Sequence, residues 1–372
     1  MGGGLMQLVA YGAQDIYLSG NPQITFFKVV YRRHTNFSME SIRQTFNGAA
    51  DFDRKVTCTV SRNGDLIHRV YVQVELSKLA INKYYKSWAG HKLIKSVEVE
   101  IGGQRIDKHY GDWLHIWNEL SQTAGHWNGY KTMVEGDSDF NDNLSETSDG
   151  EARTLYIPLQ FWFCRNPGLA LPLIALQYHE VKINVEFGSA SDVADGSPTM
   201  SSADLYVDYI YLDTDERRRF AQVTHEYLIE QLQFTGDEAA SSKVKLNFNH
   251  PVKELIWAEY GATGMKSSTY TSGYLQLNGH DRSSARPKTY YQLVQPYQHH
   301  ERVPTDGMIN VYSFALKPEE HQPSGTCNMS RIDNATLVLD GITTTSSSLK
   351  VFAVNYNVLR IMSGMGGLAY SN

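Results

Sequence analysis

Short stretches in which apolar and polar residues alternate recur along the whole chain. In residues 181–187 every odd position is apolar and every even position is polar. The same period of two appears in residues 70–76, 97–101 and 243–249. This period predicts half-buried β-strands with one face toward a core. In the first of these stretches, the residues expected to face the core are Val181, Ile183, Val185 and Phe187.

Other strands are predicted from runs of β-branched and aromatic residues. In the first half these runs cover residues 24–31, 56–60, 155–163 and 205–212. In the second half they cover residues 226–234, 255–260, 274–277, 309–316, 335–339, 349–354 and 356–362. The total is roughly 16 short strands separated by turn signals, and the best helix candidate is 112–122. The pattern therefore predicts an all-β class, a sandwich or barrel with few short helices.

The segment that leads into the strand at 181–187 begins with the turn signal Asn166-Pro167-Gly168. An apolar run follows over residues 169–176 and is interrupted by Pro172. Proline lacks a backbone donor, so neither an interior helix nor a central strand is expected there. We interpret 169–176 as buried chain that leads into the strand.

A loose internal echo is present between the two halves of the chain. Residues 97–105 (VEVEIGGQR) resemble residues 274–282 (YLQLNGHDR), with alternating apolar residues, a glycine and then an arginine. Pro167-Gly168 is likewise matched by Pro323-Ser324-Gly325. Similarity between two halves indicates a duplicated sandwich, although alternation before a glycine turn is common in β proteins.

The pattern predicts five parts. The most charged stretch, 213–222, marks the connector between two domains, and the glycine-rich ends mark an arm and a tail. The predicted parts are an N-terminal arm (1–22), a first domain (23–213), a connector (214–225), a second domain (226–363) and a C-terminal tail (364–372).

Composition and charge narrow the classes of protein. The 372 residues carry a net charge of −6, and the tight basic runs are Arg32-Arg33 and Arg217-Arg218-Arg219. A nucleic-acid binder usually has a basic stripe, so no direct contact with nucleic acid is expected. The three cysteines form neither a disulfide framework nor a metal pair. No secretory signal is expected, and no apolar run approaches the ~18 residues of a membrane span.

Motifs for catalysis or metal binding are weak, and the sequence predicts no catalytic, cofactor-binding or metal site. His179-Glu180 and His225-Glu226 each begin like a zinc-protease motif, but Ile183 and Ile229 stand where the second histidine belongs. We interpret both pairs as polar residues at strand ends. His299-His300-Glu301 is interpreted as a surface loop.

The acidic stretch 135–151 is predicted to be a surface loop. Asp137, Asp139 and Asn141 have the spacing of a calcium loop, but Asp142 replaces the required glycine and Ser148 the required glutamate. Calcium binding is therefore not expected. Four Asn-x-Ser/Thr sequons are candidate glycosylation sites: Asn36, Asn143, Asn328 and Asn334.

Several longer stretches, in the same order along the chain, resemble the major capsid protein of the nucleocytoplasmic large DNA viruses, closest to the chlorovirus (phycodnavirus) type. The stretches are LVAYGAQDIYLSGNPQITFFKVVYRRHTNFSMESI (8–42), SRNGDLI (61–67), VEIGGQRIDKHYGDW (99–113), NPGLALPLIALQYHEVK (166–182), VDYIYLDTDERRRFAQVTHEYLIEQLQFTG (207–236), LNFNHP (246–251), VYSFALKPEEHQPSGTCNMSRIDNATL (311–337) and NYNVLRIMSGMGGLAY (355–370). Together they reach nearly both ends of the chain.

The resemblance implies two consecutive eight-stranded antiparallel jelly rolls, with the chain forming a homotrimer. Such trimers are pseudo-hexagonal capsomers that tile an icosahedral shell. The implied partners are neighbouring capsomers, minor capsid proteins and an internal lipid membrane that the shell overlies without spanning it. The implied location is the virion, with assembly in the host cell cytoplasm.

The chain departs from the family pattern in two outer loops of the second domain. Residues 261–273 and 341–348 are short and contain no asparagine, so the glycans that the family carries there are not expected on asparagine. Two other hypotheses stay open at this point. One is a minor or paralogous capsid component with the same fold, and the other is a carbohydrate-binding β-sandwich, which the many aromatic residues would suit.

Overall fold

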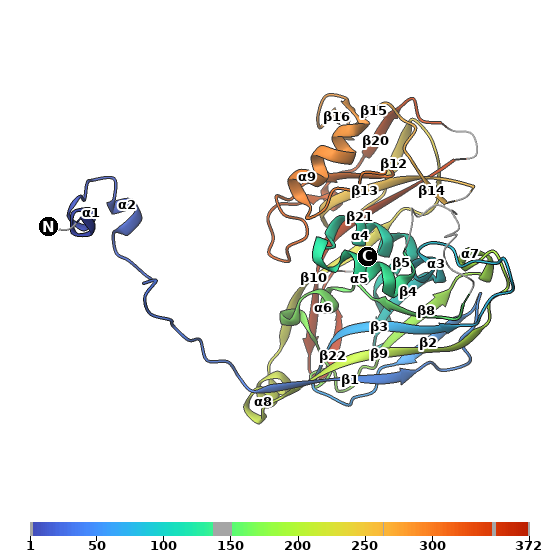
Figure 1. Ribbon diagram of the computed structural model, residues 1–372, viewed down its shortest axis with the longest axis horizontal. Coiled ribbons are helices and arrows are strands. Elements are labelled where there is room, and N and C mark those ends of the chain that lie inside the picture. Colours follow the sequence, from blue (N-terminus) through green and yellow to red (C-terminus); the bar gives the residue numbers. More distant parts are fainter. Residues whose placement is uncertain (1–2, 137–150, 263, 344–346, 371–372) are drawn as a thin grey trace. The chain divides into compact units, whose positions relative to one another are not determined.

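The computed structural model describes residues 3–136, 151–262, 264–343 and 347–370. The chain divides into two compact units, Met1–Asn36 and Phe37–Asn372. We call the first unit the arm and the second unit the body. The ribbon in Figure 1 shows the two units, and we describe each by itself.

The arm contains two short helices, α1 (Gly3–Val9) and α2 (Ile16–Ser19). The strand predicted over residues 24–31 is absent, and this prediction was wrong. Phe26 and Phe27 are 87% and 97% exposed, so the apolar run has no core to pack on within its own unit. A strand requires a hydrogen-bonded neighbour, and apolar composition alone does not supply one.

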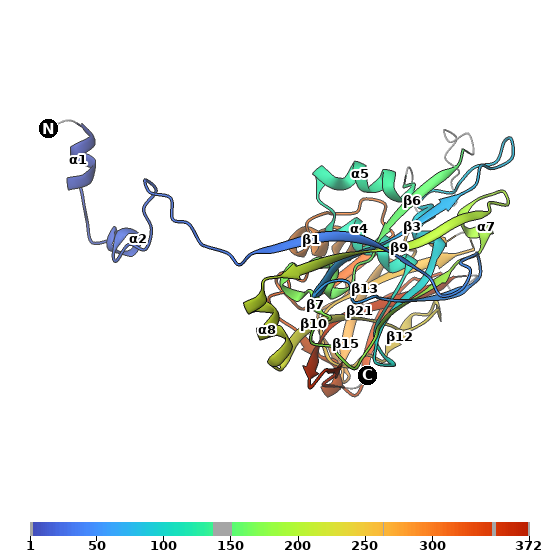
Figure 2. The same cartoon turned by 90° about the horizontal axis from the view of Figure 1, so that it is seen from below.

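Two antiparallel sheets form the first sandwich of the body. One sheet has the order β1 (Phe37–Thr45), β9 (Met200–Leu212), β3 (Leu66–Leu76) and β6 (Arg153–Pro158), and the two-residue strand β7 (Leu171–Pro172) pairs with β3. The other has the order β2 (Lys55–Thr59), β8 (Val181–Phe187), β4 (Ile94–Ile101) and β5 (Gln104–Tyr110). Figure 2 shows β1, β9, β3 and β6 side by side in one sheet.

The second sandwich repeats this order. Its larger sheet has β10 (His225–Phe234), β21 (Ser348–Met362) and β13 (Pro251–Gly261), and β13 also pairs with β14 (Gly264–Lys266) and β18 (Ile309–Ser313). The facing sheet has β12 (Lys243–Leu246), β20 (Ala335–Asp340), β15 (Ser272–Leu277) and β16 (His280–Asp281). The short remaining strands are β11 (Glu238–Ala239), β17 (Arg286–Pro287), β19 (Cys327–Asn328) and β22 (Met365–Leu368).

Eight main strands of each sandwich form a jelly roll, and these eight strands have the same order in both sandwiches. The echo predicted between 97–105 and 274–282 falls on equivalent hairpins, β4–β5 and β15–β16. Both hairpins turn through residues with positive φ, Gly102 and Gly103 in the first and Asn278 and Gly279 in the second. The sequence echo therefore marks a repeated hairpin, as interpreted.

Each jelly roll has its own hydrophobic core. In β8 the odd-numbered residues Val181, Ile183, Val185 and Phe187 are all buried in the first core, which confirms the predicted face. The segment before β8 is also buried over Leu169–Leu176 apart from Ile174, as predicted, because β7 and its turn lie against β3. In the second sandwich Leu255, Trp257, Val351 and Ala353 point into the second core.

The helices of the body were only partly predicted. Helix α4 (Gly111–Ser121) matches the expected helix at 112–122, whereas α5 (Ala124–Val134) and α8 (Thr214–Gln222) lie where no helix was predicted. The expected strand at 155–163 is shorter and ends in helix α6 (Trp162–Arg165). The remaining helical turns are α3 (Ala89–Leu93), α7 (Ala190–Val193), η1 (Pro167–Leu169), η2 (Tyr290–Val294), α9 (Gln295–His299) and η3 (Met329–Arg331).

The residues predicted as a C-terminal tail are ordered over most of their length. Strand β22 folds back on β21, and the Tyr178 backbone N–H donates to Gly364 O at 2.9 Å. The ring of His179 lies 3.0 Å from Gly366 O, so the end of the second jelly roll is attached to the first. Among the described residues no helix is long and apolar enough to cross a membrane.

Candidate assembly interface between the two sandwiches

Helix α4 is one of the elements of the first sandwich that contact the second, and its contact is the apolar one described first. It begins at Gly111, where a Cβ would lie 2.1 Å from His91 O and 2.4 Å from Ile94 O, so only glycine fits. Leu114 faces the first core, and the opposite face carries an apolar set. This set is Trp113, Ile116, Trp117 and Leu120. The helix therefore has apolar contacts on both sides, in agreement with its near-complete burial.

The surface that receives α4 is the outer face of the larger sheet of the second sandwich. Successive side chains of β13 point to opposite faces of the sheet, so Leu255 and Trp257 enter the second core while Ile256 and Ala258 point outward. The neighbouring strands add Val311, Phe352 and Val354 to the outer face. The rings of Trp113 and Phe352 lie 5.7 Å apart. This buried apolar interface makes the two jelly rolls one body.

Ion pairs surround this apolar interface. Lys350 of β21 lies 2.6 Å from Asp112 at the start of α4 and 3.3 Å from Asp237. Burial alone would lower the pKa of Lys350, but the two carboxylates outweigh it and raise that pKa. Arg302 lies 3.3 Å from Glu119 and stacks on the ring of Trp127. These contacts favour one docking orientation of the two sandwiches.

A second, more deeply buried ionic cluster joins α6 to β10. Arg165 lies 2.7 Å from Glu230, and the same carboxylate lies 2.8 Å from the amino group of the buried Lys253. Burial by itself would raise the pKa of Glu230, but Arg165, His321 and Lys253 outweigh it and lower that pKa to about 2. This cluster was not predicted from the sequence. The available signal is charged residues beside apolar runs, as in Lys253-Glu254 before residues 255–260.

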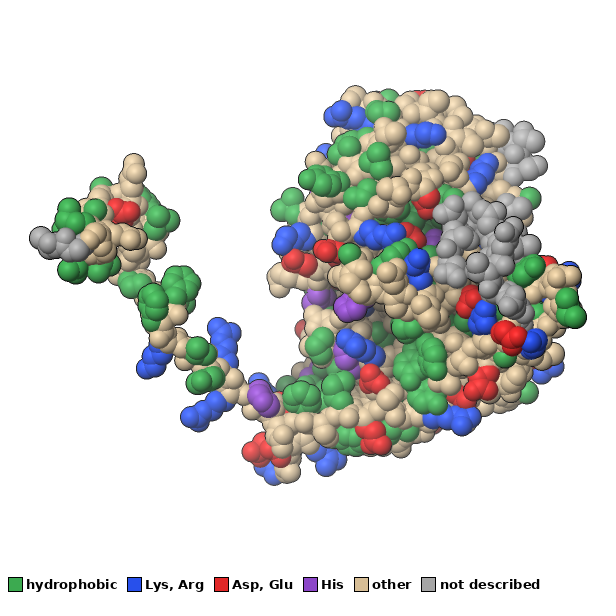
Figure 3. All heavy atoms as spheres, viewed as in Figure 1, with side chains coloured by type: hydrophobic (Ala, Val, Ile, Leu, Met, Phe, Trp, Pro, Cys, Tyr) green, Lys and Arg blue, Asp and Glu red, His purple; other side chains and the backbone are tan. Residues whose placement is uncertain are grey.

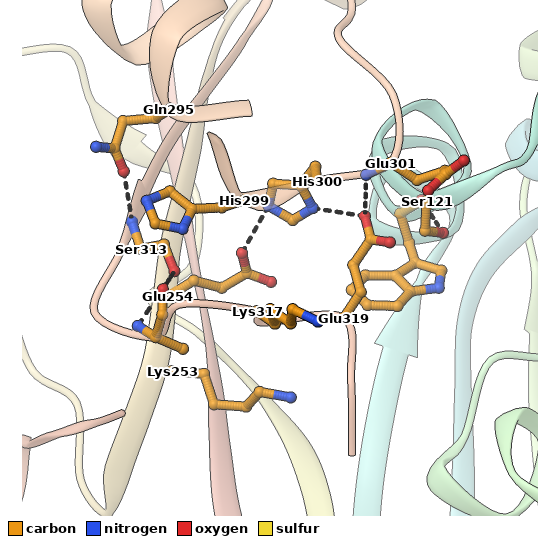
Figure 4. A network of polar contacts seen from close by, with 12 residues as sticks. Ser121, Lys253, Glu254, Gln295, His299, His300, Glu301, Ser313, Lys317 and Glu319 are labelled. Atoms are coloured by element: carbon orange, nitrogen blue, oxygen red, sulfur yellow. Dashed lines mark hydrogen bonds and ion pairs between the residues drawn. The ribbon is translucent and has the colours of Figure 1, made fainter. Parts of the chain in front are cut away.

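His300 occupies a third polar cluster within the second sandwich (Figure 4). Its side chain is fully buried, with one ring nitrogen 2.8 Å from Glu254 and the other 2.8 Å from Glu319. Burial alone would lower the pKa of His300, but the two carboxylates outweigh it and raise that pKa to about 9. The prediction of a surface loop is therefore wrong for His300, although Glu301 is exposed. Composition could not show that two distant glutamates meet this ring.

The other residues considered for metal binding do not come together. His179 lies beside the C-terminal hairpin, and the ring of His225 lies 2.7 Å from Phe220 O at the end of α8. Both lie at strand ends, as predicted. Within the described part of the chain, no group of three His, Cys, Asp or Glu residues is arranged to hold a metal ion. The calcium-loop residues Asp137, Asp139 and Asn141 lie outside the described residues.

Three of the four candidate glycosylation sites lie among the described residues. Asn36, Asn328 and Asn334 are exposed, and Asn143 lies outside the described residues. The Asn328 side chain accepts a hydrogen bond from the Ser330 backbone N–H at 3.1 Å, which caps η3. On the face of the body seen in Figure 3, acidic and basic side chains are interspersed.

Two jelly rolls of the same strand order, joined by α4 within one chain, define the double jelly-roll class of viral capsid proteins. The comparisons with known proteins narrow this class. A model of the major capsid protein N-terminus matches residues 25–213, and a model of the large eukaryotic DNA virus major capsid protein matches residues 216–367. The chain belongs to the family of large eukaryotic DNA virus major capsid proteins, and it is a structural component of the virus capsid.

Relatives match over the whole chain. The chain is 70% identical to the major capsid protein of Pyramimonas orientalis virus and 45% identical to that of Paramecium bursaria Chlorella virus 1, with 100% of both chains covered in each case. The structure of PBCV-1 VP54 matches with a TM-score of 0.83 and 41% identity over 94% of this chain and 100% of that chain. The Faustovirus major capsid protein shares the fold, with a TM-score of 0.79 at 13% identity over 95% and 94% of the two chains.

Proposed function

We propose that three copies of this chain form a pseudo-hexagonal capsomer that tiles an icosahedral shell. The observation that supports it most directly is the docking of one jelly roll on another of the same strand order. Three chains with two similar jelly rolls each would give a capsomer with six similar sides, and such capsomers pack into a hexagonal lattice. Light scattering of the purified chain should give three times 42.0 kDa. A monomer at high concentration, with no lattice in particles, would overturn the proposal.

We propose that the chain is the main shell protein and not a low-copy paralogue. Its full-length identity to two major capsid proteins supports this assignment. Quantitative mass spectrometry of purified particles should find this chain in excess over every other protein with the same fold. A few copies per particle would show that it is a minor component.

We propose that the capsomer contacts neighbouring capsomers, minor capsid proteins and an inner lipid membrane, without direct contact to nucleic acid and without catalysing a reaction. The exposed apolar side chains of the arm, such as Phe26 and Phe27, support a role in such contacts because apolar side chains favour burial. We also propose that the capsid is assembled in the host cytoplasm. Cryo-electron microscopy of particles and fractionation of infected cells test these contacts and this location.

We propose Asn36, Asn328, Asn334 and Asn143 as sites for N-linked glycans. The first three are exposed, which glycan attachment requires. Peptide mass spectrometry before and after glycosidase treatment of virion protein tests each site. Unmodified asparagine at all four sites would overturn the proposal.

A further inference from the structure

The two jelly rolls carry helical segments at equivalent places in their topology. In the first, α4 and α5 connect β5 to β6, and in the second, η2 and α9 connect β17 to β18. Tyr291 of η2 packs into the second core, as Leu114 of α4 packs into the first. The two helical segments therefore sit on their own sandwiches in corresponding ways.

The outward faces of these segments differ in what covers them. The outward face of α4 is buried against the second sandwich. The outward face of η2 and α9 exposes apolar side chains together with the neighbouring Leu316, whose carbonyl lies 3.0 Å from the ring of His299. We call this surface the helix patch; its residues are Leu293 (44% exposed), Val294 (40%), Tyr297 (79%) and Leu316 (72%).

The surface that α4 covers also has a counterpart. In the second sandwich, β13 lies between β21 and β18, and Ile256 pairs with Phe352 and Val311 at the covered site. In the first sandwich, β3 lies between β9 and β6 in the same way. The outer face of these strands carries three neighbouring tyrosines, and we call this surface the tyrosine face. Its residues are Tyr71 on β3, Tyr206 opposite it on β9, and Tyr156 on β6, which pairs with Gln73.

The tyrosine face is ordered and open. Tyr71 and Tyr206 are stacked with ring centroids 5.1 Å apart and an interplanar angle of 3°, and Tyr156 lies 6.3 Å from Tyr71. None of the three is buried, and Tyr156 is 38% exposed. Tyrosine combines apolar area with a polar end, so it tolerates water before assembly and packs well afterwards. Aliphatic side chains such as those under α4 suit a contact that is always closed.

We propose that the helix patch of one chain packs on the tyrosine face of a second copy of this chain. This contact would repeat between chains the contact that α4 makes within a chain. In Figure 1, α9 and β9 lie at opposite ends of the body, so one chain does not close this contact with itself. A head-to-tail contact repeated in this way forms a ring when the rotation closes. The inference rests on the proposed trimer and identifies the residues that hold it.

Photo-crosslinking tests the partner surface directly. Tyr297 is replaced by p-benzoylphenylalanine in the full chain, which keeps an aromatic side chain at an exposed position. Irradiation of the trimer should give a covalently linked pair of chains of twice 42.0 kDa. In this product, position 297 of one chain should be joined to a peptide of the other chain that contains Tyr71, Tyr156 or Tyr206. The matched control carries the same residue at Ile81, which is 92% exposed and outside the helix patch. A trimer that crosslinks through other peptides, or not at all, overturns the inference.

Charge substitution tests the same contact energetically. We expect Tyr297→Asp and Tyr156→Asp each to raise the concentration at which half of the trimer dissociates by about tenfold or more, because each places a charge in an apolar contact. Ile81→Asp should leave this concentration within about twofold. Circular dichroism verifies that each variant stays folded, and an unchanged concentration for both tyrosine variants overturns the inference. If the unsubstituted chain forms no trimer, the proposed function fails first, and sedimentation analysis of that chain separates the two failures.

Discussion

Arg165 of the first jelly roll lies 2.7 Å from Glu230 of the second, and this ion pair connects the two halves of the chain. The guanidinium also stacks on Trp117 of α4, 4.7 Å from the ring centroid. The pair is thus continuous with the apolar interface under α4. One residue of the short helix α6 therefore contributes to both the ionic and the apolar parts of the interface between the sandwiches.

Arg165→Met is expected to lower the free energy of unfolding by about 2–4 kcal/mol. The reason is that Glu230 stays buried after the substitution and keeps Lys253 and His321 but loses its closest cation. The low pKa of Glu230, about 2, should rise toward the ordinary value of 4.5 in this variant, so the variant should lose less stability than the parent chain as pH falls from 4.5 toward 2. Urea unfolding at several pH values measures both effects.

The matched control is Arg360→Met. Arg360 lies 2.8 Å from Glu226, but both side chains are more than half exposed. Exposed pairs contribute little because water screens them, so the change should be within about 1 kcal/mol. Equal losses for Arg165→Met and Arg360→Met would contradict the assignment of Arg165 as a buried structural cation.

His300 should make the protein lose stability in mild alkali. Its folded pKa of about 9 exceeds the ordinary value of 6.5, so the folded state holds this proton more tightly than the unfolded state. The resulting stabilisation is fully present below pH 6.5 and is lost as pH rises through about 9. His300→Gln should be less stable than the parent chain at pH 6 and should lose less stability between pH 6.5 and 9.

Thermal unfolding at half-unit pH steps measures this difference. The control is His299→Gln, because His299 is the last residue of α9 and its ring lies 3.0 Å from Leu316 O, whereas the His300 ring lies between Glu254 and Glu319. Its pH profile should follow that of the parent chain. A parallel profile for His300→Gln would show that the ring is not held as a cation between Glu254 and Glu319.

The alternation of apolar and polar residues predicted much of the fold. Where one face of a strand meets a core and the other faces water, the pattern appears directly in the sequence, as in Val181–Phe187. The duplicated hairpin was detectable for the same reason. In contrast, β1 (Phe37–Thr45) was missed because its first five residues are all exposed, so their sequence shows no core-facing period.

The interface between the sandwiches could not be predicted in the same way. On β13 both faces are buried, one in the second core and one under α4, so residues 254–260 show no alternation. The clusters around Glu230 and His300 join residues far apart in the chain, for example His300 and Glu254. Local pattern carries no information on such pairs, since only the folded topology brings them together.

His91 should make the protein lose stability in acid. It is fully buried next to Trp88, its Nε2 lies 2.7 Å from the hydroxyl of Tyr130, and burial lowers its pKa to about 3. The unfolded state therefore takes up a proton below pH 6.5 that the folded state refuses, and stability falls from pH 6.5 toward 3. His91→Gln should reduce this loss, although not abolish it, because burial also lowers the pKa of His115 well below 6.5.

Unfolding midpoints between pH 4 and 7 measure the effect of His91. His126→Gln serves as the control, because His126 is exposed on α5, and its profile should match that of the parent chain. If His91→Gln lost stability as steeply as the parent chain in this range, the neutral buried state of the ring would be wrong.

Val185→Asp is expected to prevent the formation of soluble trimer. Val185 is fully buried in the first core on β8, which pairs with both β2 and β4, so the new carboxylate would have no route to water. An unpaired buried charge costs several kcal/mol, which is comparable with the whole stability of a domain.

The control is Lys182→Asp on the outer face of the same strand. It changes charge without burial, because the Lys182 side chain is 37% exposed. Soluble yield and size-exclusion profiles distinguish the two variants: Lys182→Asp should elute with the parent chain, whereas Val185→Asp should be insoluble or aggregated. Normal assembly of Val185→Asp would show that the inward face of β8 is assigned incorrectly.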